Sequence, residues 1–258
     1  MPPENPLRNM LSRMRVFSNW YNIELVYAGI RKPGIDVKTW GGSRIHTRDS
    51  GDLAHLDEVI CGRAYDQEPC RIPVSGVIVD VGAHLGSFSL YSVFKRKAKR
   101  VVSCEPCPDN LKMLRMNVKS NRLDDVITVV PKAVSGKHEL RTFYLSNSNT
   151  GGNSLFGDAN WLQGDIGSTF QVECLTLKEV LDDNGIDQVD FLKLDCEGAE
   201  IDILQNIDEH TSDRVNMIGM EFHNYPREWF VSRLQELGFS VFPSKKPWRN
   251  RVYIIASK

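Results

Sequence analysis

The feature that most limits how this chain can fold is a regular alternation of short apolar segments with helical ones, which begins at Val77. Short runs of Val, Ile and Leu are typical of strands buried on both faces of a parallel sheet. Strands are expected at 77–81, 101–104, 127–131, 189–195 and 215–222, and helices at 87–94, 110–119, 176–183, 199–206 and 226–238. Alternating strands and helices form an open sheet with helices on both faces. The expected fold class is therefore α/β.

Two pairs of segments depart from this alternation. Residues 239–242 and 253–256 are expected to end the chain as an antiparallel pair of strands, and residues 140–145 and 170–175 to form a hairpin. The long segment between the hairpin strands is rich in Ser, Asn and Gly. A polar segment of this length in a compact domain is usually a lid or a binding loop, although disorder is the alternative.

The first seventy residues do not show this alternation of apolar and helical segments. Leu7, Met10, Leu11 and Met14 recur at helical spacing, and the apolar side continues to Leu25. We expect an amphipathic helix that packs on the domain or mediates a homodimer, followed by a hairpin of residues 37–40 and 44–47. The expected domains are a helical and hairpin extension (1–70) and a main domain (71–258).

Composition excludes several classes of protein. Among 258 residues, 32 Lys and Arg balance 33 Asp and Glu, so charge provides no case for nucleic-acid binding. No apolar stretch approaches the roughly 18 residues that span a bilayer. The N-terminal residues lack the order of a signal peptide, and the six cysteines have no regular spacing. We expect a cytoplasmic protein that binds neither nucleic acid nor membrane.

The sharpest local signal is a glycine turn between the first strand and the first helix of the main domain. Asp80 is in that strand, Gly82 and Gly86 permit a tight turn, and Glu105 follows 19 residues later at the end of the second strand. A carboxylate placed there can bind two ribose hydroxyls. The pattern predicts a nucleoside site; the alternative is that the glycines serve only a tight turn.

The same turn indicates which nucleoside is bound. A dinucleotide site uses Gly-x-Gly-x-x-Gly, so that a helix N-terminus meets a pyrophosphate. Here His84 replaces the second glycine and Asp80 precedes the turn. An acid suits a cationic ligand, which favours S-adenosylmethionine over NAD.

These residues, with four further segments, resemble a known family. The segments are Glu105-Pro106, 132–135 (Lys-Ala-Val-Ser), 192–200 (Leu-Lys-Leu-Asp-Cys-Glu-Gly-Ala-Glu) and 221–223 (Glu-Phe-His). Together they resemble the FkbM-type S-adenosylmethionine-dependent methyltransferases from about residue 49 to residue 257. The resemblance implies a seven-stranded Rossmann-like sheet whose last strand is antiparallel, and O-methylation of sugars, polyketides and other small metabolites.

The resemblance also implies roles for single residues. Asp80 and Gly82 would line the methionine part of the cofactor, Glu105 would hold the ribose, and Ala133 would lie beside the adenine. His84 stands where the family usually has Asn. The expected cofactor-binding residues are Asp80, Gly82, His84, Gly86, Glu105, Ala133 and Asp195.

The acceptor side is expected at the carboxyl ends of the later strands. Asp195 and Glu197 follow the fourth strand, and His223 follows the fifth. We expect His223 to accept the proton of an acceptor hydroxyl, with Asp195 orienting either the histidine or the acceptor. Glu197 is the third expected catalytic residue. Glu200 is assigned to the first turn of a helix, where an acid is stabilising. A divalent metal on Asp195 and Glu197 is the minor alternative, since spacing shows no third oxygen ligand; no metal is expected.

The expected function is methyl transfer from S-adenosyl-L-methionine to a hydroxyl of a small metabolite or glycan. Three alternatives remain: a carboxyl methyltransferase, an NAD-dependent oxidoreductase, and a catalytically silent cofactor-binding domain. Cys104 and Cys107 have the spacing of a redox or zinc site, but no second pair completes it, so the spacing is taken as accidental.

Overall fold

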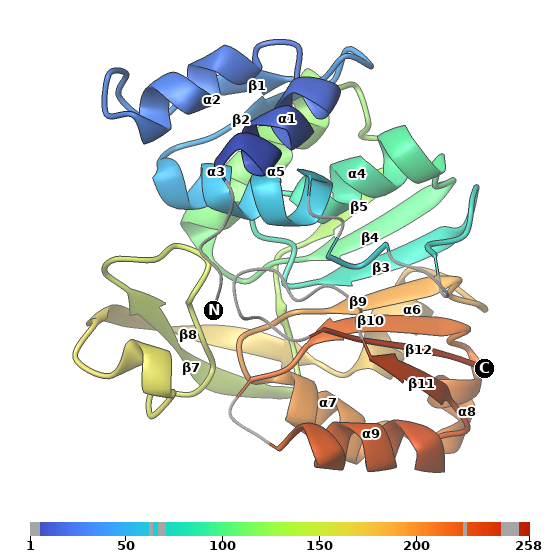
Figure 1. Ribbon diagram of the computed structural model, residues 1–258. Coiled ribbons are helices and arrows are strands. Elements are labelled where there is room, and N and C mark those ends of the chain that lie inside the picture. Colours follow the sequence, from blue (N-terminus) through green and yellow to red (C-terminus); the bar gives the residue numbers. More distant parts are fainter. Residues whose placement is uncertain (1–5, 62–63, 67–70, 224–225, 244–252) are drawn as a thin grey trace.

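The centre of the computed structural model, which describes residues 6–61, 64–66, 71–223, 226–243 and 253–258, is a seven-stranded sheet with helices on both faces (Figure 1). In chain order the strands are β3 (Val77–Val81), β4 (Arg100–Cys104), β5 (Ile127–Val130), β9 (Phe191–Leu194), β10 (Met217–Glu221), β11 (Ser240–Pro243) and β12 (Tyr253–Ser257). Their spatial order is β11-β12-β10-β9-β3-β4-β5. The last strand, β12, is antiparallel to both of its neighbours. The α/β class and the seven-stranded sheet are confirmed.

The strand order fixes where a ligand can bind. From β3 the chain moves outward to β4 and β5, and then returns to add β9 on the other side of β3. In open α/β sheets such a reversal leaves a crevice at the carboxyl ends of the two central strands. The turn that carries Gly82 and the segment that carries Asp195 both begin at this crevice, after β3 and β9.

Alternate residues of the central strands face two hydrophobic cores. Ile78 and Phe191 pack with Phe88 on one face, whereas Val79 and Leu192 point to the other. Helices α4 (Ser87–Arg96) and α5 (Pro108–Ser120) cover the first face. Side chains of α6 (Leu177–Asp183), α7 (Glu200–Asn206) and α9 (Arg227–Glu236) fill the second core, and the short α8 (Glu209–Asp213) precedes β10. This double burial explains the nearly continuous apolar runs in the sequence.

The N-terminal residues form an outer layer over α4 and α5 (Figure 1). This layer contains α1 (Pro6–Val16), α2 (Trp20–Tyr27), the antiparallel pair β1 (Asp36–Lys38) and β2 (Arg44–His46), α3 (Ser50–Leu56) and a π-helical turn (Asp57–Cys61). The hairpin is confirmed, but the expected single helix is two helices. The chain leaves the first helix because Phe17 forms a β-bridge with Thr39, and the Ser18 amide donates to the Lys38 carbonyl.

The extension shares a core with the sheet rather than forming one of its own. Phe17, Ile23 and Leu53 belong to the same buried cluster as Ile78 and Phe88. The expected domain boundary falls beside residues 67–70, which lie outside the described residues, so it stays a prediction. Leu7 and Leu11 on α1 are exposed, and self-association through this helix also stays a prediction.

A smaller, three-stranded sheet stands beside the carboxyl edge of the main sheet (Figure 1). It is formed by β6 (Ala133–Val134), β7 (Glu139–Ser146) and β8 (Ile166–Leu175), and the expected hairpin is the antiparallel β7–β8 pair. The 147–165 segment that joins β7 to β8, which we call the β7–β8 loop, contains one short 3-10 helix (Asn160–Leu162). None of the described helices is both long and apolar enough to cross a bilayer.

Candidate functional site

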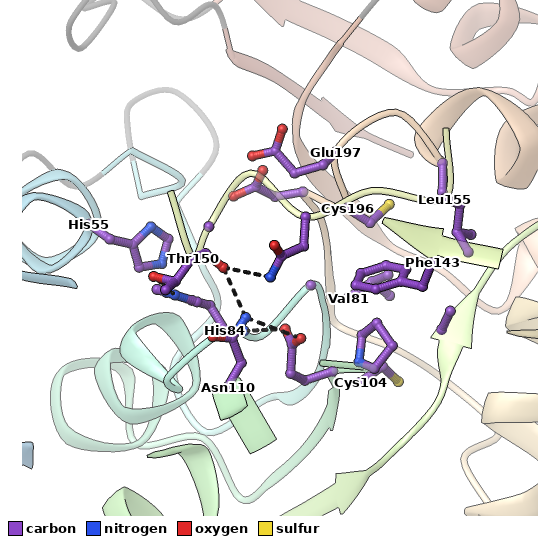
Figure 2. A pocket seen from close by; sticks show the side chains of 18 of the residues that line it. His55, Val81, His84, Cys104, Asn110, Phe143, Thr150, Leu155, Cys196 and Glu197 are labelled. Atoms are coloured by element: carbon purple, nitrogen blue, oxygen red, sulfur yellow. Dashed lines mark hydrogen bonds between the residues drawn. The ribbon is translucent and has the colours of Figure 1, made fainter. Parts of the chain in front are cut away.

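A cavity of about 260 Å³ opens at the crevice between β3 and β9 (Figure 2). Six of the expected site residues line it: Gly82, His84, Glu105, Ala133, Asp195 and Glu197. Asp80, Gly86 and His223 lie outside its lining. The tertiary structure therefore brings together residues that are spread over more than a hundred positions of the sequence.

The glycine turn packs against the end of β9. Gly82 has a φ of +76°, and a Cβ atom on it would lie 1.8 Å from the carbonyl oxygen of Asp195. Its amide and that of Ala83 both donate to the Cys104 carbonyl at 3.0 Å. Gly82 is therefore required because its backbone and that of Asp195 lie too close together for a side chain. This requirement holds with or without a bound ligand.

Asp80 is used inside the protein. It is fully buried, its Oδ1 lies 3.0 Å from Nζ of Lys193, and its Oδ2 accepts a hydrogen bond from Ser89 at 2.6 Å. It lies outside the cavity lining, and its charge is paired with that of Lys193. Direct contact of Asp80 with the cofactor stays a prediction.

Lys193 is the central residue that sequence reasoning missed. It is 1% exposed, and Nζ donates to the Gly82 carbonyl at 2.8 Å while lying 3.7 Å from Oδ2 of Asp195. Burial alone would lower the pKa of Lys193, but the charges of Asp80 and Asp195 raise it above its ordinary value. The ammonium therefore ties the turn after β3 to the end of β9. The available signal was a single lysine within the otherwise apolar strand Phe191–Leu194.

Glu105 lies at the cavity wall directly after β4. One carboxylate oxygen accepts from the His84 amide at 2.8 Å and the other from the Cys107 amide at 2.9 Å. Burial raises the pKa of Glu105, while these two amide donors oppose the shift. A carboxylate held at both oxygens keeps one orientation, which is what a bound ribose diol would require of it.

His84 is held by residues of the N-terminal layer. Nε2 lies 3.1 Å from Nη2 of Arg48, and Arg48 in turn binds both carboxylate oxygens of Asp52. Burial lowers the pKa of His84 to about 3, and the nearby charge of Arg48 acts in the same direction. The imidazole is therefore neutral at physiological pH. Nε2 must accept from Arg48, since a guanidinium can only donate, and this places the ring hydrogen on Nδ1.

One wall of the cavity is apolar. Ala133 on β6, Phe143 on β7 and Leu155 in the β7–β8 loop are all buried, and all three line the cavity. The labelled side chains of Phe143 and Leu155 lie beside each other in Figure 2. A flat apolar ring such as a purine could bind against this surface.

Another part of the cavity lining is acidic. Asp195 follows β9, and Glu197, whose φ is +53°, lies in the turn before α7. Oε1 of Glu200 accepts from the Cys196 amide at 2.7 Å, and Oε2 accepts from the Gly198 amide at 2.9 Å. Glu200 thus stabilises the turn itself, in keeping with the structural role expected for it.

His223 lies behind this acidic wall. Its Nδ1 is 3.3 Å from Glu200, and its Nε2 is 3.5 Å from both Glu197 and Glu221. Burial would lower the pKa of His223, but Glu200 and Glu197 together hold it well above the ordinary value. These carboxylates therefore favour the protonated imidazole. The expected role of His223 as a general base stays a prediction.

Two further segments contribute to the cavity lining: the N-terminal layer, which was assigned no site role, and the β7–β8 loop, which was expected to be a lid or a binding loop. From the N-terminal layer, His55 and Glu58 line it, and the hydroxyl of Tyr65 donates to Oδ2 of Asp195 at 2.7 Å. From the β7–β8 loop, Thr150 approaches Nε2 of His84, and the Ser154 hydroxyl donates to the Glu197 carbonyl at 2.6 Å. The loop thus contacts both His84 and the Glu197 backbone, and its role as a lid stays a prediction.

Comparison with known proteins identifies the family. Residues 80–241, which are more than half of the chain, match the methyltransferase FkbM domain. The chain belongs to the FkbM methyltransferase family. The resemblance expected from the sequence is confirmed, and the cofactor of this methyltransferase is S-adenosyl-L-methionine.

The curated relatives are distant. The chain is 24% identical over 231 residues to the 31-O-demethyl-FK506 methyltransferase FkbM of Streptomyces tacrolimicus, covering 80% of this chain and 89% of the relative. It is 26% identical over 218 residues to the methyltransferase sdnD of Sordaria araneosa, covering 74% and 83%. It is also 24% identical over 220 residues to the AMB antimetabolite synthetase AmbE of Pseudomonas aeruginosa, covering 74% of this chain but only 10% of that much longer protein.

Among solved structures, an FkbM methyltransferase from Methylobacillus flagellatus shares the fold. Its TM-score is 0.51 at 15% identity, and the match covers 98% of this chain and 58% of the other. At this identity the likeness concerns the fold alone.

Proposed function

We propose that this FkbM-family protein transfers the methyl group of S-adenosyl-L-methionine to a hydroxyl oxygen of a small metabolite or glycan. The observation that carries the proposal is the lining of a single cavity, which joins apolar side chains and Glu105 to the carboxylates of Asp195 and Glu197. The name of the Streptomyces tacrolimicus relative, a 31-O-demethyl-FK506 methyltransferase, supports an oxygen acceptor.

The chain's own residues fit the cofactor. Glu105 would accept hydrogen bonds from the ribose hydroxyls, and Ala133 would lie against the adenine together with Phe143 and Leu155. Gly82, His84 and Gly86 would shape the turn around the methionine part, with Asp195 nearby and Asp80 acting through Lys193. When bound, the cofactor supplies a methyl group on a positively charged sulfur. The main task of the protein is then to align that carbon with the acceptor oxygen and to exclude water.

Asp195, Glu197 and His223 are the residues that we propose for catalysis. Methyl transfer to an alcohol requires the hydroxyl proton to leave. The carboxylates of Asp195 and Glu197 line the cavity and can accept a hydrogen bond from that hydroxyl. Nε2 of His223 lies 3.5 Å from Oε2 of Glu197, and the histidine would accept the hydroxyl proton only when its ring is neutral.

The acidic wall also bears on whether the acceptor is a carboxylic acid. Three carboxylates, those of Glu58, Asp195 and Glu197, line the cavity, against one lysine, Lys132, which pairs with Glu173. Like charges repel, and the repulsion is stronger in a partly dry cavity than in water. The charges of the protein's own side chains therefore favour a neutral hydroxylated acceptor over a carboxylic acid, which is ionised at neutral pH.

The test is a screen that compares matched pairs of neutral polyols and sugars with carboxylic acids, read by formation of S-adenosylhomocysteine. We expect turnover with a hydroxylated neutral compound. Turnover confined to carboxylic acids would reject the hydroxyl acceptor. In parallel, calorimetry with S-adenosylhomocysteine and with NAD tests whether the protein is an NAD-dependent oxidoreductase. Saturable binding of NAD alone would reject the methyltransferase activity proposed here.

We further propose that the protein works in the cytoplasm as a reduced chain, without nucleic acid. Cys61, Cys104, Cys107, Cys174 and Cys196 are free thiols. Such thiols persist in a reducing compartment. Cys104 and Cys107 are both buried, which supports the view that their spacing is accidental.

A further inference from the structure

We propose that Asp195, Glu197 and His223 form a binding site for a divalent cation at the acceptor end of the cavity. This deepens the proposed function and rests on it for the consequence in catalysis, but the binding itself can be tested separately. The sequence offered two carboxylates two residues apart and no third ligand. The fold supplies the third ligand as a nitrogen, from a segment 26 positions later than Glu197.

The first argument is convergence. One ligand atom from each of the three residues can be chosen so that all three atoms lie within 4.8 Å of one another. They come from the end of β9, from the turn before α7 and from the segment after β10, three parts of the chain that the parallel sheet places side by side. A mixed set of carboxylate oxygens and one imidazole nitrogen suits Mn²⁺ and Zn²⁺ better than Ca²⁺, which takes six to eight oxygens.

The second argument is a gap of the size of an ion. Nε2 of His223 lies 3.5 Å from Oε2 of Glu197 and 3.5 Å from Oε1 of Glu221. A direct hydrogen bond between an imidazolium and a carboxylate would be about 2.7–2.9 Å long. Ligands about 2.1 Å from a tetrahedral cation are about 3.4 Å apart. The Glu197–His223 spacing therefore leaves room for a cation between the two groups, and a bound cation would take the place of the proton on Nε2.

The third argument is the orientation of the histidine. Nδ1 faces Oε1 of Glu200, which is fully buried and fixed by the Cys196 and Gly198 amides. A carboxylate behind one ring nitrogen directs the other nitrogen toward a metal, and this is the usual support of metal-binding histidines. Asp195 is supported in the same way by the hydroxyl of Tyr65.

The site opens to the cavity, because Asp195 and Glu197 both line it. Three protein ligands leave open positions that an acceptor oxygen can occupy, and a bound cation lowers the pKa of such an oxygen. The hydroxyl proton would pass to water, and the oxygen's electron pair would form the new O–C bond. The electron pair of the broken C–S bond would remain on sulfur, which leaves S-adenosylhomocysteine.

The experiment titrates the 258-residue chain, treated with EDTA and then desalted, with Mn²⁺ by electron paramagnetic resonance and calorimetry. We expect one saturable Mn²⁺ per chain and weaker binding of Ca²⁺. His223→Ala and Glu197→Gln should each weaken Mn²⁺ binding by at least about tenfold. Both variants must retain S-adenosylhomocysteine binding, which shows that they are folded.

The matched control is His138→Ala. His138 also lies beside two carboxylates, 2.6 Å from Glu179 and 3.4 Å from Glu173, but it is exposed and outside the cavity lining. This variant should bind Mn²⁺ like the wild type. Absence of saturable Mn²⁺ binding, or equal binding in the wild type and in both site variants, would overturn the proposal. Failure of every acceptor in the screen, with the Mn²⁺ site intact, would instead count against the proposed function alone.

Discussion

The hydroxyl of Tyr65 donates a 2.7 Å hydrogen bond to Oδ2 of Asp195, across 130 positions of sequence. Tyr65 precedes the residues that match the family domain, whereas Asp195 lies at the cavity. The N-terminal layer therefore does more than cover the sheet, because it orients a carboxylate at the proposed site of methyl transfer.

Removing this hydroxyl should impair turnover more than folding. A hydrogen bond to a charged group contributes about 1.5–3 kcal/mol. If the bond matters chiefly for the orientation of Asp195 in the transition state, Tyr65→Phe should lower kcat by about 10–100-fold, with little change in the KM for the cofactor. The matched control is Tyr91→Phe, which removes a buried bond to Asp66. A similar fall of kcat in both variants would show a general loss of packing.

Glu105 should govern the affinity for the cofactor. Glu105→Ala removes the charged acceptor for the ribose hydroxyls, so we expect the dissociation constant of S-adenosylhomocysteine, measured by calorimetry, to rise at least about tenfold. Glu105→Gln keeps one acceptor oxygen, and its dissociation constant should lie between those of Glu105→Ala and the wild type. Glu139→Ala, an exposed acid on β7, is the control. An unchanged dissociation constant in folded Glu105→Ala would assign the acid a structural role.

Lys193 should be essential for stability. Its removal leaves Asp80 and Asp195 buried without their shared cation, and breaking a buried ion pair costs about 3–5 kcal/mol. We expect Lys193→Met to lower the free energy of unfolding in urea by about that amount. Lys193→Met combined with Asp80→Asn should recover part of the loss. Lys178→Met, which breaks an exposed pair with Asp182, should have little effect. Similar losses in the two lysine variants would contradict this account.

His84 should make stability depend on pH. In the unfolded chain a histidine binds a proton near pH 6.5, whereas burial and Arg48 lower the pKa of His84 to about 3 in the fold. Between these values the unfolded state holds one more proton. The free energy of unfolding should therefore decrease as the pH falls from about 6.5 to about 3. His84→Asn, which has no titrating group, should flatten this part of the curve in urea titrations at several pH values. If the free energy of unfolding of the variant depended on pH as steeply as that of the wild type, the proton taken up on unfolding would belong to a group other than His84.

The sequence by itself determined the features that repeat locally. Strands buried on both faces appear as apolar runs, so the positions of β3, β4, β5, β9 and β10 along the chain could be predicted from the sequence. The glycine turn and Glu105 could be predicted as well, because a parallel sheet brings the carboxyl ends of its strands to one edge. The antiparallel end of the chain followed from the family resemblance and from the last two apolar segments.

Only the tertiary structure decided how charged groups are paired. In the sequence, Lys193 is a single charged residue within an apolar strand. The structure explains it, because Asp80 and Asp195 both lie near its ammonium group. His223 was expected to be a general base, and the carboxylates that raise its pKa come from segments that meet only in the fold. The break after α1 likewise depends on a bridge from Phe17 to Thr39. The periodicity of the sequence shows which face of a helix or strand is buried. The partner of a buried charge depends instead on contacts between distant segments, and those contacts form only when the sheet packs.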